Sequence, residues 1–64
     1  MNSTLTFPSA QAARDFRHAH GTGGWIFSPD DGGEAILFPP HMPPVAIFRH
    51  PMTKGKSGAL IGSA

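Results

Sequence analysis

The first third of the chain has a short strand-like run followed by a pattern of helical period. Residues 5–7, Leu-Thr-Phe, suit a pleated strand, and Pro8 ends it. Ser9 is a favoured helix N-cap, and Gly21 accepts the left-handed conformation in which many helices end. The sequence therefore predicts a helix from Ala10 to about His20.

This predicted helix is amphipathic. At about 100° per residue, its apolar face has small side chains around one aromatic ring, and consists of Ala12, Ala13, Phe16, Ala19 and His20. Its polar face consists of Gln11, Arg14, Arg17 and His18. Because small side chains let a helix approach a sheet closely, we expect the apolar face to pack on one.

The middle of the chain predicts a β-hairpin. Residues 25–28 and 34–38 form its strands, and Pro-Asp-Asp-Gly-Gly at residues 29–33 favours a turn. Side chains alternate between the faces of a strand, so Trp25 and Phe27 share one face and the residue between them lies on the other. Both faces are apolar and need cover. The helix is expected on one face, and the C-terminal tail or a second subunit on the other.

The C-terminal half begins with a stiff turn at residues 39–44, where four of six residues are proline and lack an N–H. Val-Ala-Ile-Phe-Arg at residues 45–49 predicts a further strand, antiparallel to the previous one. Residues 1–51 are expected to be one domain, and residues 52–64 a flexible basic tail that adds at most a short strand at residues 59–61. The predicted fold class is a small α+β domain of order β-α-β-β-β. It has a three- to four-stranded, mainly antiparallel sheet with one helix packed on a face.

Length and composition restrict the ways in which such a domain is stabilised. A chain of 64 residues forms one small core, which supplies only about 3–5 kcal/mol without further support. The absence of cysteine excludes disulfides and thiolate metal sites, which leaves a bare core, a histidine-held metal or self-association. Self-association is the expected one because it needs no special residues, and a homodimer is its simplest form. No signal-peptide pattern and no stretch of about 20 apolar residues is present, so the expected location is cytoplasmic and no membrane partner is expected.

Charge is unevenly distributed along the chain. Two arginines and all four acidic residues precede residue 35, whereas Arg49, Lys54 and Lys56 follow it without any acid. The second half is therefore mildly basic, which favours anionic partners.

Motifs for catalysis are weak. Gly55-Lys56-Ser57 resembles the end of a phosphate-binding loop, but His50 stands where the first glycine of that loop should be. The acidic residues gather around the predicted turn, where aspartate is expected for backbone hydrogen bonding. We therefore expect no enzyme, no cofactor and no small-molecule substrate.

Histidine is the other candidate for chemistry. His18 and His20 stand two positions apart, so on a helix they point about 200° away from each other. A zinc site needs three or four converging ligands, and no metal site is expected.

Two functions of different classes remain. The first is a small accessory protein that acts through protein–protein contacts with an unidentified partner; chains of this size class are typical of phages and plasmids, where they modulate host machinery. The second is a nucleic-acid-binding module with basic residues on phosphates and an aromatic stacking platform. The candidate binding residues for both are Arg14, Arg17, His18, Trp25, Phe27, Arg49, Lys54 and Lys56.

Overall fold

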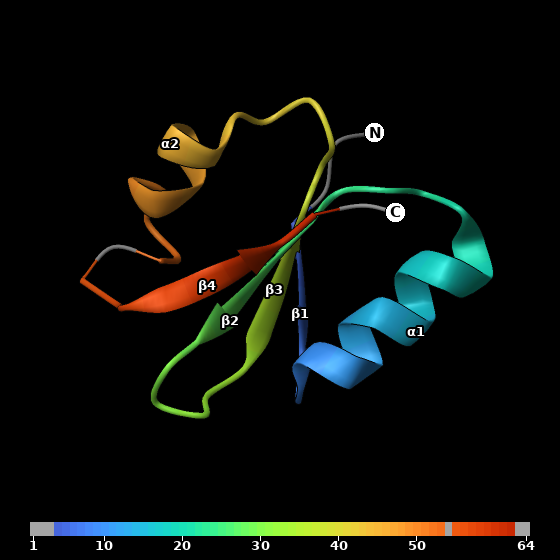
Figure 1. The fold of residues 1–64 in the computed structure, drawn as a ribbon, viewed down its shortest axis with the longest axis horizontal. Helices are drawn as coiled ribbons and strands as arrows, with labels where there is room; N and C mark the ends of the chain where they lie inside the picture. Colours follow the sequence, from blue (N-terminus) through green and yellow to red (C-terminus); the bar gives the residue numbers. More distant parts are fainter. Residues whose placement is uncertain (1–3, 54, 63–64) are drawn as a thin grey trace.

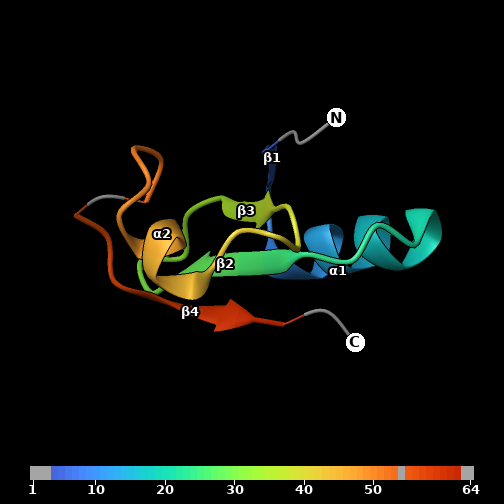
Figure 2. The same ribbon diagram turned by 90° about the horizontal axis from the view of Figure 1, so that it is seen from above.

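The sheet of this protein has four antiparallel strands in the order β1-β3-β2-β4. The computed structural model describes residues 4–53 and 55–62. The strands are β1 (Leu5–Phe7), β2 (Trp25–Pro29), β3 (Ala35–Phe38) and β4 (Gly58–Ile61). Helices α1 (Ala10–His20) and α2 (Pro44–Phe48) lie on opposite sides of the sheet (Figures 1 and 2). The predicted α+β class is confirmed.

Helix α1 begins and ends where its capping residues predict. The Ser9 hydroxyl accepts a hydrogen bond from the N–H of Ala12 at 3.2 Å, which satisfies one of the free donors of the first turn. Gly21 has a φ of 59° and donates its N–H to the carbonyl oxygen of Arg17 at 2.9 Å. Both ends are therefore determined by local sequence.

The predicted hairpin is formed by β2 and β3. Its register pairs Trp25 with Phe38 and Phe27 with Ile36. In the turn, the Asp31 carboxylate accepts the N–H of Gly33 at 2.8 Å, as expected of aspartate in this position.

The strand predicted at residues 45–49 is wrong, because this segment forms helix α2. Pro43 is extended, with φ −70° and ψ 149°, and Pro44 occupies the first turn, where its fixed φ suits a helix and its missing N–H costs nothing. A further strand beside β3 is also excluded, because β3 is already paired with β1 on one side and β2 on the other.

The fourth strand comes from the segment that the sequence predicted as a flexible tail. The short strand expected at residues 59–61 is β4, which pairs with β2 from Ile26↔Ile61 to Pro29↔Gly58. Outside this ladder, the N–H of Asp30 donates to the carbonyl oxygen of Ser57 at 2.8 Å. The C-terminal segment from Ser57 is therefore attached to the edge of the sheet.

Two apolar clusters cover the two faces of the sheet. Under α1, Ala13 packs with Ile26, Ala35 and Leu37, and the partly buried Phe16 lies against this group. On the other face, the buried cluster consists of Phe27, Ile36, Phe38 and Ile47. The cover expected from a tail or a second subunit on this second face is supplied by α2. Among the described residues, no helix has the length and apolar character needed to cross a membrane.

Candidate functional site

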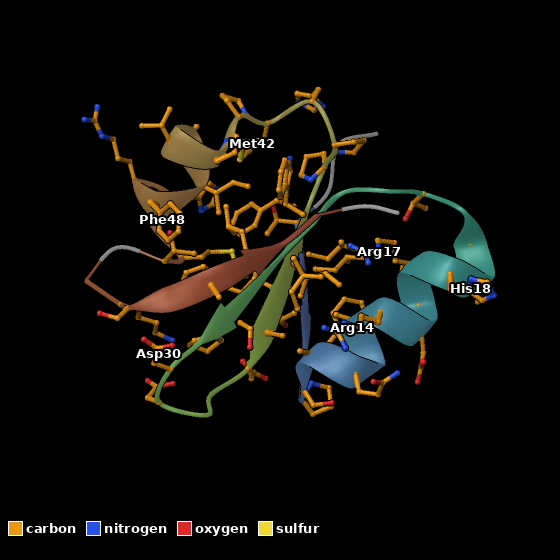
Figure 3. The ribbon with its side chains drawn as sticks, in the orientation of Figure 1. Arg14, Arg17, His18, Asp30, Met42 and Phe48 are labelled. Carbon is orange, nitrogen blue, oxygen red and sulfur yellow. The ribbon has the colours of Figure 1, made fainter. Side chains whose placement is uncertain are left out.

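Three of the predicted binding residues lie together along one side of α1. Arg14, Arg17 and His18 line an open concavity of about 470 Å³. The loop after the helix completes the lining with Gly21, Thr22 and Gly23. Positions 14, 17, 18 and 21 follow the i, i+3, i+4, i+7 spacing of neighbours on a helix surface. Figure 3 shows where these three side chains lie on α1.

Arg17 differs from the exposed arginine that the helical pattern predicted. Its side chain is half-buried, and Nη1 donates to the carbonyl oxygens of Gly24 at 3.1 Å and of Ile61 at 3.3 Å. These bonds join α1 to the start of β2 and to the end of β4. Arg17 therefore has a structural role in addition to its place in the concavity.

Arg14 and His18 are exposed and stand one helical turn apart. Within residues 4–53 and 55–62, neither arginine of the concavity forms an ion pair with an acidic side chain. The nearby Asp15 accepts a hydrogen bond from the Gln11 amide at 2.9 Å. The concavity is therefore a small basic site.

Of the two rings predicted as a stacking platform on the sheet, Trp25 is partly exposed and Phe27 is not exposed. Phe27 is fully buried beneath α2, and its ring meets that of Phe48 edge to face, with 5.9 Å between centroids. Trp25 is only partly buried, but it packs against the same cluster, and a Cβ at Gly62 would lie 3.3 Å from its ring. Phe27 is excluded from base stacking because α2 covers the face to which it points.

The remaining predicted residues lie on the α2 side of the molecule. Arg49 is the C-cap of α2, and both Arg49 and Lys56 are exposed. Lys54 lies outside the described residues. Helices α1 and α2 stand at opposite ends of the view in Figure 1, so Arg49, at the end of α2, is separated from the concavity on α1.

An exposed apolar surface on α2 was missed by the sequence reasoning. Val45 is 60% exposed, Phe48 is 45% exposed and Met52, just after the helix, is 38% exposed. Val45 and Phe48 are three positions apart and therefore neighbours on the helix, whereas Ile47 points inward and is fully buried. We call Val45, Phe48 and Met52 the α2 surface. Helical spacing would have revealed it, but the segment was predicted as a strand.

The turns after α2 hold this surface in place. Thr53 is 1% exposed, and its hydroxyl contacts the carbonyl oxygens of Ile47 and His50. The imidazole of His50 accepts the N–H of Met52 at 3.2 Å and meets the ring of Phe38 edge to face at 5.0 Å. The α2 segment is therefore connected to the core by both polar and apolar contacts.

No group of three histidine, aspartate or glutamate side chains comes close enough to hold a metal ion in the described part of the chain. Comparison with protein-family models, curated proteins and solved structures gave no match in any of the three.

Proposed function

We propose that this chain is a small accessory protein that binds another protein through the α2 surface. The observation that carries the proposal is the exposure of three large apolar side chains within eight residues of chain. Single exposed apolar residues are ordinary, but neighbouring ones on a fixed element are typical of interaction sites. A phenylalanine and a methionine are also among the residues enriched in protein interfaces.

Charge indicates the kind of partner. Arg49 caps α2, Lys56 follows in the next loop, and no acidic residue occurs after Glu34. A partner with an apolar patch bordered by carboxylates would complement this side of the molecule.

A second copy of the chain is the weaker partner. In a two-fold symmetric contact each residue near the axis faces its own equivalent, so a contact with its axis at the C-terminal end of α2 would bring two copies of Arg49 together. Like charges in an interface are unfavourable, which favours a different protein over a homodimer.

The nucleic-acid alternative has lost support on two points. Phe27 is buried, so the sheet offers no pair of stacking rings. Arg49 and Lys56 lie on the α2 side, away from Arg14 and Arg17. The phosphate backbone of a nucleic-acid strand would need a continuous row of basic residues.

The test is a comparison of captured proteins between wild type and a surface variant. Val45→Ser with Met52→Ser removes apolar area from the α2 surface without touching the buried cluster under it. Leu5→Ser is the matched control, because Leu5 is also apolar and 37% exposed but lies on β1 at the other edge of the sheet from β4. We expect one partner to be captured by wild type and by the control and lost with the double variant. Equal capture by all three chains would contradict the proposal.

A further inference from the structure

We propose that the concavity beside α1 binds the phosphate group of a small phosphorylated molecule. This site is independent of the α2 surface and uses different residues. Its lining combines two guanidinium groups, one imidazole and the backbone of a glycine-containing loop. Arginine is well suited to phosphate because its planar fork matches the oxygens of that group.

Arg17 is already oriented before any ligand arrives. Its Nη1 donates to two carbonyl oxygens, those of Gly24 and Ile61. The N–H groups on Nε and Nη2 have no acceptor within residues 4–53 and 55–62, and together they form the edge of the guanidinium that binds an oxyanion with two parallel hydrogen bonds. Fixing this side chain in the folded state reduces the conformational entropy that binding would otherwise cost.

Arg14 adds a charge that the helix itself does not explain. The negative end of the helix dipole stabilises cations in the last turn, which accounts for Arg17, His18 and His20. Arg14 is in the middle of the helix, outside this turn, yet it lines the same concavity. An anion bound there would also offset the repulsion between the two neighbouring arginines.

The loop after the helix brings backbone N–H groups to the border of the concavity. Gly21 and Gly23 have positive φ angles of 59° and 65°, and a Cβ at Gly21 would meet no atom within 4 Å. The glycine therefore serves the turn and leaves the rim of the concavity open. The N–H groups of Thr22 and Gly23 find no acceptor among the residues that the structure describes. Successive backbone N–H groups of this kind form small anion-binding sites.

The shape of the site favours a small ligand over a nucleic acid. A volume of about 470 Å³ lies within the range of roughly 300–1,000 Å³ for small-molecule sites. Among the residues that the structure describes, the other exposed arginine and lysine, Arg49 and Lys56, belong to the segment that follows α2, so these residues form no basic path that leads away from the concavity. One phosphate group fits this distribution of charge better than a chain of them.

The test is a titration of the isotope-labelled protein with inorganic phosphate, followed by amide chemical shifts, with chloride keeping the ionic strength constant. We expect saturable shifts confined to residues 14–24, with a dissociation constant on the order of 1 mM. Arg14→Gln removes one charge from an exposed side chain and should weaken binding about tenfold. Lys56→Gln removes the same charge on the α2 side and should leave binding unchanged.

Two outcomes would overturn the proposal. Shifts that never saturate, or that are equally reduced by both variants, would mean general attraction to a positive protein. In a second titration, a short single-stranded oligonucleotide that binds more tightly than phosphate and shifts residues 49–56 as well would indicate a nucleic-acid surface instead. Neither outcome depends on protein capture by the α2 surface, so the two proposals can fail separately.

Discussion

The guanidinium of Arg17 donates a hydrogen bond to the carbonyl oxygen of Ile61, which lies 44 positions later in the chain. The same nitrogen donates to Gly24. One side chain thus connects α1 to Gly24, the residue directly before β2, and to the end of the edge strand β4. In a domain with so small a core, such a connection between distant segments contributes measurably to stability.

Replacing Arg17 with methionine should therefore destabilise the fold. Methionine keeps most of the apolar stem but leaves two carbonyl oxygens without their charged donor, at a cost of about 1–3 kcal/mol. Urea unfolding followed by the fluorescence of Trp25 measures the change. Arg14→Met is the control, since Arg14 is exposed and makes no hydrogen bond to the described residues, and its effect should stay within about 0.5 kcal/mol. Equal losses in the two variants would show that the Arg17 bonds do not matter.

Thr53→Val should loosen the turns that follow α2. Valine matches the shape of threonine but has no hydroxyl, so the carbonyl oxygens of Ile47 and His50 lose their side-chain donor. Since Thr53 is buried, we expect the free energy of unfolding to fall by about 1–3 kcal/mol. Thr53→Ser retains the hydroxyl and should lose less. A serine variant that is less stable than the valine variant would point to packing of the methyl group rather than to the hydrogen bonds.

Gly58→Ala should weaken the attachment of β4. A Cβ at this position would lie 2.5 Å from the carbonyl oxygen of Ser28 and 2.7 Å from the ring of Phe27, so both strands would have to separate. Forcing extra volume into a packed site costs about 1–3 kcal/mol. Hydrogen exchange of the β4 amides should become faster in this variant. The neighbouring Ala59→Ser, at an exposed position, should leave the exchange rates unchanged.

Elements with local signals were the ones that could be predicted from the sequence. Ser9 and Gly21 fix the ends of α1, and the Asp31 turn fixes the hairpin, each through contacts within a few residues. The local signal of the α2 segment is weaker, because Pro44 suits the first turn of a helix but the four apolar residues that follow fit a strand or a helix equally well. Its outcome depends on β3 having no free edge, which is a property of the whole sheet.

In the candidate site, too, the features set by local sequence could be predicted, whereas those set by distant segments could not. The grouping of Arg14, Arg17 and His18 on one side of α1 follows from helical spacing and is visible in the sequence. The partial burial of Arg17 is not, because its acceptor belongs to β4. The sequence predicts that the face bearing Phe27 needs cover, but it does not predict that α2, the one element whose type was mispredicted, supplies this cover.

The division of α2 into an inner and an outer side leads to a last prediction. Ile47 is fully buried beside Phe27 and Phe38, whereas Val45, two positions earlier, is 60% exposed. Ile47→Val removes one buried methylene group and should cost about 0.5–1.5 kcal/mol. Val45→Ala removes two methyl groups from an exposed position and should change the free energy of unfolding by less than about 0.5 kcal/mol.

If Val45→Ala proves the more destabilising of the two, Val45 belongs to the core and the α2 surface is smaller than its exposure indicates. If Ile47→Val is the more destabilising, the apolar side chain at position 45 contributes little to the fold. This exposed side chain is then available to contact a partner, as the proposed function requires.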